Sequence, residues 1–205
     1  TGQLWGNPLY NWSKMKRNKY DWWVSRFRAT LENVDIIRLD HFRGFEAFWQ
    51  VPAGEDTAIK GKWVKGPGSA FFKAIKKELG ELPIIAENLG VITEEVEEIR
   101  YEHKLPGMKV LQFAWGSEKS PLRPSDDNTF IPHYIDDKQV VYTGTHDNPT
   151  TQQWWDEFAT KEEKELLISY LATEAQDVVG ELIRCAFQSR AELAIIPMQD
   201  FLRLG

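Results

Sequence analysis

Three apolar segments of the sequence each lead into a group of acidic, imidazole or amide side chains. The three groups are Asp40-His41, Glu87-Asn88 and His146-Asp147-Asn148. Carboxylates crowded at one edge repel each other, so this arrangement is unfavourable for a purely structural surface. Two carboxylates whose environments push their pKa values apart can instead divide the roles of nucleophile and general acid. The pattern therefore favours catalysis by paired carboxylates.

The first two groups differ in their predicted surroundings. Arg38 and Asp40 lie two residues apart on a predicted strand, so they share a face, and the guanidinium stabilises the ionised form of Asp40. Glu87 follows an apolar run, and apolar surroundings raise the pKa of a carboxyl group, as a general acid requires. Each group also has a structural interpretation, namely an ion pair, a helix cap and a strand-end turn. We favour catalysis because the groups recur at successive strand ends.

Short apolar strands alternate with helical segments along the chain. Strands are predicted at 35–40, 83–87, 108–115, 139–143 and 191–196. Helices are predicted at 20–33, 69–79, from 93 to before Pro106, 151–158, 161–171 and 174–188. Trp23, Phe27 and Leu31 form the apolar stripe of the first helix, and Ser69 is predicted to cap the second. A polar, proline-rich stretch follows the third strand, from 116 to about 137.

This alternation predicts an α/β fold with parallel βαβ units. Five strands are five of the eight that a (β/α)8 barrel needs, and such barrels carry their active sites at the C-terminal strand ends. We therefore expect residues 1–205 to be the C-terminal portion of one catalytic (β/α)8 barrel, holding roughly its last five strands, with the preceding and following parts missing. A doubly wound open sheet is the alternative, although no glycine-rich phosphate loop follows a strand.

Composition excludes several classes of protein. The 205 residues carry a net charge of -6, which argues against a nucleic-acid-binding face. No apolar run approaches 20 residues, so no membrane helix is expected, and no signal peptide is visible. The four histidines are scattered and no metal-binding motif occurs, so no metal is expected. Cys185 is interpreted as a small buried residue. Nine tryptophans are unusual, and flat rings suit the apolar faces of sugars.

Several segments resemble a known family when taken in order. They are Gly2-Gln-Leu-Trp-Gly-Asn-Pro-Leu-Tyr10, Arg38-Leu-Asp-His-Phe-Arg-Gly44, Ala86-Glu-Asn-Leu-Gly90, Thr145-His-Asp-Asn148 and Ile196-Pro-Met-Gln-Asp200. Together they resemble the 4-α-glucanotransferases, the amylomaltase or disproportionating-enzyme family of the α-amylase clan. The first segment is the more family-specific one, since the others recur in related form across the clan. Asn88 and Pro149 stand where aspartate is common in the family.

The resemblance implies a glycosyltransferase that moves segments between α-1,4-glucans such as maltooligosaccharides, starch or glycogen chains, without a cofactor. It implies Asp40 as nucleophile, Glu87 as general acid and base, and Asp147 as the third carboxylate. In retaining enzymes of this kind the nucleophile and acid/base carboxyl groups lie about 5–5.5 Å apart. The implied substrate-binding residues are Arg38, His41, His146, Asn148, Trp5 and Tyr10.

Two other functions stay open at this stage. An α-glucan hydrolase of the same clan would share the three carboxylates, and a chain with only five barrel strands could be a non-catalytic glucan-binding fragment with open sheet edges. For either enzyme the expected location is the cytoplasm, or the plastid stroma in a plant.

Overall fold

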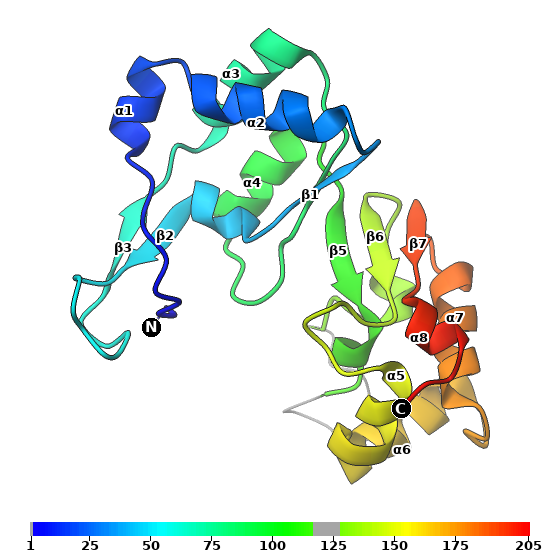
Figure 1. The fold of residues 1–205 in the computed structure, drawn as a ribbon. Coiled ribbons are helices and arrows are strands. Elements are labelled where there is room, and N and C mark those ends of the chain that lie inside the picture. The colour runs from blue at the N-terminus through cyan, green and yellow to red at the C-terminus, as the bar shows by residue number, and fades with distance from the viewer. Residues whose placement is uncertain (1, 117–127) are drawn as a thin grey trace. The chain divides into compact units, whose positions relative to one another are not determined.

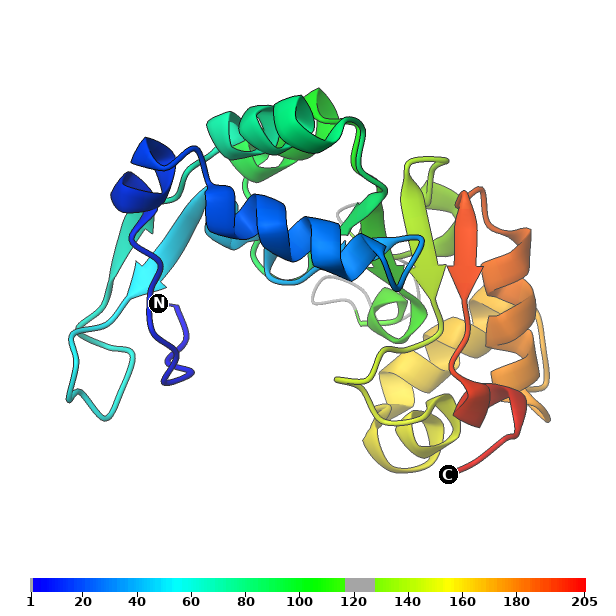
Figure 2. The ribbon, with the colours of Figure 1, turned by 45° about the horizontal axis from the view of Figure 1, so that its top comes forward.

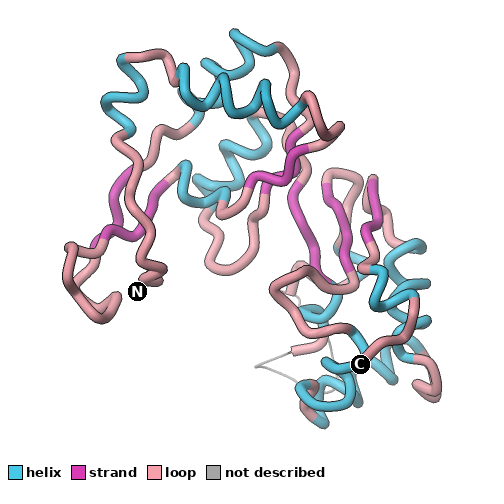
Figure 3. The backbone as a smooth tube through the Cα atoms, viewed as in Figure 1, coloured by secondary structure: helices cyan, strands magenta, loops and turns pink. Residues whose placement is uncertain are grey.

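The computed structural model describes residues 2–116 and 128–205, which form two compact units. The first unit runs to Gly107 and the second begins at Met108. Figure 1 gives the element labels used below, and each unit is considered by itself. Helices and short strands are mixed along the chain (Figure 3), so the predicted α/β class is confirmed.

The first unit combines a parallel strand pair, a hairpin and four helices. Its strands are β1 (Ile37–Leu39), β2 (Ala47–Gln50), β3 (Lys62–Lys65) and β4 (Ile84–Ala86). Its helices are α1 (Trp12–Arg17), α2 (Asp21–Leu31), α3 (Ser69–Leu79) and α4 (Glu94–Glu102), with a 3-10 turn η1 (Phe42–Phe45). Strands β1 and β4 pair in parallel, whereas β2 and β3 form an antiparallel hairpin.

An aromatic core holds the first unit together. Trp23 and Phe27 of α2 pack with Phe71 and Phe72 of α3 and with Phe45 of η1. The predicted stripe on α2 is confirmed for its first two members, whereas the third position, at the end of the helix, is only half-buried. These rings pack in one core with Leu39, Ile84 and Ala86 of the strand pair. Because large aromatic rings bury much apolar surface, they hold the helices against the strands.

The second unit is a three-stranded sheet with helices against it. Its strands, in sheet order, are β5 (Gly107–Val110), β6 (Gln139–Tyr142) and β7 (Leu193–Ile195), and β6 and β7 are parallel. Its helices are α5 (Thr151–Gln153), a π-helical turn η4 (Trp154–Phe158), α6 (Lys161–Leu171), α7 (Val178–Gln188) and α8 (Met198–Phe201), and its 3-10 turns are η2 (Leu111–Ala114) and η3 (Pro132–Tyr134). Figure 2 shows the long helices α6 and α7 behind the sheet of this unit.

The structure corrects several predicted boundaries. The strand predicted at 108–115 ends at Val110, where the chain tightens into η2, and the helix predicted from 174 begins at Val178. Ser69 does not cap α3, because Gly68 occupies the cap with φ +60° and the Ser69 hydroxyl is hydrogen-bonded to His103 Nε2 at 2.8 Å. The hairpin β2–β3 and helix α1 were not predicted. Residues 117–127 of the predicted polar stretch lie outside the described residues.

The described helices are all too short or too polar to cross a membrane.

Candidate active site

The pairing of β1 with β4 brings two of the predicted catalytic residues to adjacent strand ends. Leu39 pairs with Ala86, so Asp40 and Glu87 directly follow a matched pair of residues. The Glu87 N–H donates to the Leu39 carbonyl at 3.0 Å, and the Phe42 N–H donates to the Glu87 carbonyl at 3.0 Å. Neighbouring strands lie about 4.8 Å apart, so both carboxylates belong to one small edge of the unit.

Asp40 lies in the open and is held by Arg38. Arg38 Nη1 donates to Asp40 Oδ1 at 2.6 Å, and the Asp40 side chain is 73% exposed. The predicted sharing of one face is thus confirmed. An ion pair this exposed contributes little to stability, about 0–1 kcal/mol. The arrangement is better suited to orienting a carboxylate toward a ligand than to stabilising the fold.

Glu87 has the opposite environment. It is half-buried, and its two oxygens accept from the backbone, Oε2 from His41 N–H at 2.7 Å and Oε1 from Leu89 N–H at 2.8 Å. Burial raises the Glu87 pKa, and the raised value persists against the two backbone hydrogen bonds and Arg38, which lower it. The predicted direction is confirmed. The donors are the backbone N–H groups of His41 and Leu89, and neither belongs to α4, so Glu87 does not cap that helix, whose N-cap is Thr93.

His41 has a strained backbone at the junction between β1 and η1. Its φ of +47° is left-handed, a region that non-glycine residues rarely occupy and that often marks functional sites. Burial lowers the pKa of His41, so the neutral imidazole is favoured. Trp5 meets the His41 ring edge-on at 4.7 Å between ring centroids and stays 56% exposed.

Tyr10 has different neighbours. Its ring packs against Trp12, Trp22 and Trp23, with ring centroids 5.1–5.8 Å apart. The first unit thus brings Trp5 to His41, whereas Tyr10 contacts the tryptophans of α1 and α2 and its hydroxyl accepts from Arg26 Nη1 at 3.5 Å.

The third predicted group lies in the second unit, on the turn after β6. His146 Nε2 lies 3.4 Å from Asp147 Oδ2, and both side chains are about 70% exposed. Asn148 Oδ1 accepts from the Thr145 N–H and hydroxyl, each at 2.9 Å. The carboxamide oxygen therefore fixes the turn, and both His146 and Asp147 project from it into the open.

A buried carboxylate holds both ends of this turn. Asp200 is 1% exposed and accepts from the Thr143 hydroxyl, the Thr151 N–H and the Thr151 hydroxyl. Asp200 was recognised in the sequence only as part of a strand-end motif. Its structural role requires contacts 49 and 57 residues apart in sequence, which no local pattern reveals.

A cavity of about 400 Å³ lies beside Asn148 in the second unit. Its lining combines amide, acidic and aromatic side chains, a composition that suits a polar ligand with apolar faces. The lining residues are Gln112, Phe113, Gly116, Asn148, Pro149, Trp154, Phe158 and Glu163. The sequence did not predict the cavity.

Among the described residues, no cluster of three or more His, Cys, Asp and Glu side chains is arranged to hold a metal ion.

The family model of the 4-alpha-glucanotransferases matches residues 1–205. The chain belongs to the 4-alpha-glucanotransferase family.

Relatives from distant organisms agree with this membership. The 4-alpha-glucanotransferase of Synechocystis is 50% identical over 208 residues, covering 100% of this chain and 40% of the relative. The chloroplastic/amyloplastic 4-alpha-glucanotransferase of Arabidopsis thaliana is 48% identical, covering 100% of this chain and 34% of the relative. The chain thus spans between about a third and two fifths of the length of these curated relatives.

A solved amylomaltase has the same fold over this segment. The Streptococcus agalactiae amylomaltase, in complex with acarbose, matches with a TM-score of 0.90 and 34% identity, covering 98% of this chain and 40% of that one. The resemblance inferred from the sequence motifs is confirmed at the level of family and fold.

Proposed function

We propose that the protein containing this segment is a 4-α-glucanotransferase that moves α-1,4-glucan segments between maltodextrins with retention of configuration. One observation carries the proposal. Asp40 and Glu87 follow a matched residue pair of two parallel strands, yet one is exposed and ion-paired while the other is half-buried with a raised pKa. Such a division of environments is what separates a nucleophile from a general acid.

The proposed reaction has two steps. Glu87 protonates the glycosidic oxygen while Asp40 attacks the anomeric carbon, which gives a covalent glucosyl-enzyme and releases the leaving segment. Glu87, now ionised, takes the proton from the 4-hydroxyl of an acceptor glucan, which attacks the anomeric carbon and frees Asp40. All atoms of this chemistry come from the two carboxyl groups and the glucans, so we propose no cofactor.

The remaining assignments complete the proposal. Asp147 is the third carboxylate and binds sugar hydroxyls on the way to an oxocarbenium-like transition state. Arg38 orients the Asp40 carboxylate through their ion pair, while His41, His146 and Asn148 contact sugar hydroxyls. The amylomaltase solved with acarbose supports a ligand of the α-glucan type. The segment is proposed to supply roughly the last five strands of a (β/α)8 barrel, as the C-terminal part of one catalytic domain.

Transfer exceeds hydrolysis only where an acceptor glucan outcompetes water. Trp5, exposed and in contact with His41, is suitably placed to give an acceptor sugar a stacking surface and to exclude water. Tyr10 belongs to the same segment, Gly2–Tyr10. We propose that the packing of Tyr10 against the tryptophans of α1 and α2 holds this segment in place. Relatives in bacteria and in plastids support a location in the cytoplasm or the plastid stroma.

The decisive experiment incubates the full-length protein with maltotriose and sizes the products. We expect glucose together with a ladder of longer maltodextrins, at a constant number of reducing ends. Asp40→Ala should abolish the ladder, whereas Asp56→Ala, which removes an exposed aspartate of the loop between β2 and β3, should not.

Each other outcome points to a different function. Glucose and maltose alone, with rising reducing ends, would identify a hydrolase. A folded full-length protein that leaves maltotriose intact would support a non-catalytic glucan-binding protein. A ladder that survives in Asp40→Ala would refute the assignment of the nucleophile.

A further inference from the structure

A buried arginine links the nucleophile segment to the acid/base segment. Arg43 lies in η1, three residues after Asp40, and is only 8% exposed. Its Nη1 donates to the carbonyl of Val91, in the loop between Glu87 and α4. Its guanidinium lies over the ring of Trp63 on β3, 4.1 Å from the ring centroid. One side chain of η1 therefore contacts two other segments that are distant in sequence, and so links three segments.

The contacts of Arg43 are unusual for a residue that only stabilises a fold. Burying a guanidinium is costly unless its donors are used. Within the described residues Arg43 Nε is buried without a hydrogen-bond partner, so part of this cost is not recovered. Buried polar groups of this kind call for an explanation beyond packing. The explanation offered by the geometry is the position of the loop that Arg43 holds.

That loop carries the acid/base residue. Glu87 accepts hydrogen bonds from the backbone of His41 and Leu89, and Val91 lies two residues beyond Leu89. The loop reverses through Gly90, whose φ of +86° is a conformation that glycine adopts without strain. With a flexible residue next to it, the Val91 carbonyl needs an external contact to stay in place, and Arg43 supplies it.

The hairpin supports the arginine from its other side. Trp63 pairs across the strands with Trp49, and their rings meet at 5.2 Å between centroids. A Cβ on Gly2 would collide with the Trp49 ring at 2.2 Å, so the segment that bears Trp5 runs directly against the hairpin. The β2–β3 hairpin thus packs against both the segment that bears Trp5 and the guanidinium of Arg43.

We propose that Arg43 is a positioning residue that, supported by Trp63, holds the Glu87–Val91 segment against η1 and so keeps the general acid in register with the nucleophile. The inference rests on the proposed roles of Asp40 and Glu87 and adds a residue to that machinery. Displacements of about 1 Å at a catalytic group can cost about 100-fold in rate. Loss of the Arg43 contact is therefore expected to lower kcat more than it changes KM.

The test compares variants of the full-length protein in maltotriose disproportionation. We expect Arg43→Met to lower kcat about 10- to 100-fold with KM nearly unchanged. Arg43→Lys keeps the charge but lacks the planar fork, so it should recover only part of the loss. Trp63→Phe keeps a ring face and should be mild, whereas Trp63→Leu should be severe. Arg184→Met, which removes an exposed arginine paired with Glu181, is the matched control and should leave kcat unchanged.

Two further readouts separate positioning from general stability. The double variant Arg43→Met with Trp63→Leu should be no slower than Arg43→Met alone, because both changes remove the same support. A loosened loop also hydrates Glu87, so its pKa should fall and the alkaline limb of kcat/KM should move to lower pH. A lower melting temperature with unchanged kcat and pH profile would overturn the proposal.

Amide hydrogen exchange tests whether Arg43 holds the Glu87–Val91 segment, even if the full-length protein lacks the proposed activity. The amides of His41, Phe42 and Leu89 donate to Glu87, and they should exchange faster in Arg43→Met than in Arg184→Met. Unchanged exchange at these amides would refute this role of Arg43. Wild-type protein that makes no maltodextrin ladder, but whose Arg43→Met variant exchanges faster, would refute the proposed function while leaving the positioning role intact.

Discussion

His41 donates its backbone N–H to Glu87 Oε2 at 2.7 Å, and His41 is the residue directly after Asp40. The carboxyl group proposed as the acid/base is therefore held by the peptide unit next to the proposed nucleophile. This contact depends on the left-handed backbone of His41, which turns its N–H toward Glu87. The two carboxyl groups thus keep a fixed relation through the backbone, before any ligand binds.

The division of roles between the two carboxylates can be tested with substrates that bypass the acid and the base. Glu87→Gln should lower kcat with maltotriose by about 10²- to 10⁴-fold, because the proton donor is lost. α-Maltosyl fluoride needs no proton on its leaving group, and azide needs no general base as acceptor. Glu87→Gln should therefore recover activity with this pair, measured as fluoride release.

The same pair of reagents provides the control. Asp40→Asn lacks the nucleophile, so it should form no α-maltosyl azide, because direct displacement of fluoride by azide inverts the anomeric carbon and gives only the β product. Formation of α-maltosyl azide by Asp40→Asn but not by Glu87→Gln would mean that the two roles are reversed.

The pH dependence of kcat/KM should reflect the raised pKa of Glu87. The protonated form is the active acid, so activity should fall as the pH rises through a value above the ordinary range of glutamate. Arg38 lowers this pKa through its charge, so Arg38→Met should raise it and move the alkaline limb to higher pH. Initial rates at low maltotriose concentration measure this limb. A limb that moves to lower pH in Arg38→Met would contradict the assignment of Glu87.

The sequence was sufficient to predict the residues at the strand ends, but not the residues that hold them in position. Asp40 and Glu87 were predictable because a short alternating segment marks β1 and a continuous apolar run marks β4, and each places the next residue at the sheet edge. Arg43 and Trp63 meet from segments that are separate in sequence, and the hairpin that carries Trp63 has no strong alternating pattern. Ser69 failed for a different reason. The local sequence predicted that it would cap α3, but its hydroxyl is hydrogen-bonded to His103, which is distant in sequence.

Cys185 should be unreactive in the folded protein. It is buried, and burial raises its pKa to about 11, so roughly one thiol in a thousand is ionised at pH 8. We expect iodoacetamide at pH 8 to leave the peptide containing Cys185 unmodified in native protein and to label it fully in guanidinium chloride, as read by mass spectrometry. Complete labelling within minutes, without loss of the native circular dichroism spectrum, would contradict the buried state.

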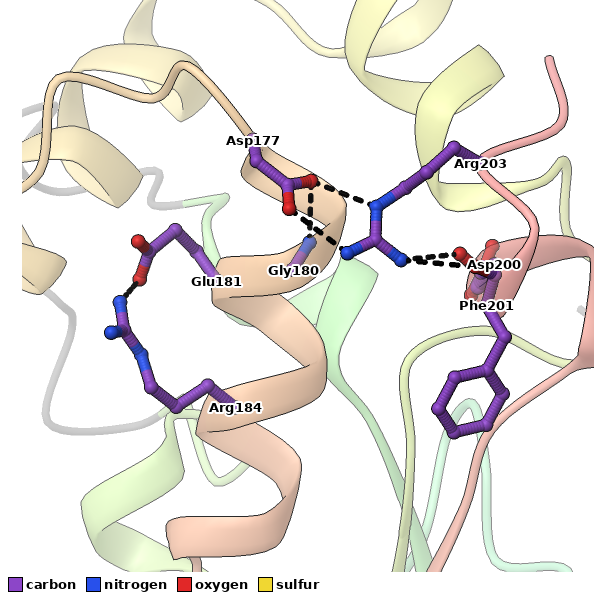
Figure 4. Close-up of polar contacts among 7 residues, drawn as sticks. All are labelled: Asp177, Gly180, Glu181, Arg184, Asp200, Phe201 and Arg203. Atoms are coloured by element: carbon purple, nitrogen blue, oxygen red, sulfur yellow. Dashed lines mark hydrogen bonds and ion pairs between the residues drawn. The ribbon is translucent and has the colours of Figure 1, made fainter.

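Two aspartates of the second unit should respond very differently to the same substitution. Asp200 is buried and holds both ends of the turn that carries Asp147, whereas Asp177 is exposed and forms a two-bond ion pair with Arg203 (Figure 4). In Asp200→Asn an amide N–H₂ group faces either the threonine hydroxyls or the Thr151 N–H, which costs about 1–3 kcal/mol of unfolding free energy. Because the turn loses its anchor, transfer activity should fall as well.

Asp177→Asn is the matched control for this prediction. Asp177 Oδ1 accepts the Gly180 N–H as the N-cap of α7, and asparagine caps a helix as well as aspartate does. Only the exposed ion pair is lost, so the expected change is below about 1 kcal/mol, with normal activity. Urea denaturation of the full-length protein, followed beside maltotriose turnover, measures both effects. Equal destabilisation by the two substitutions would mean that Asp200 does not carry the turn, since a buried acceptor of three hydrogen bonds should cost more to replace than one side of a solvated ion pair.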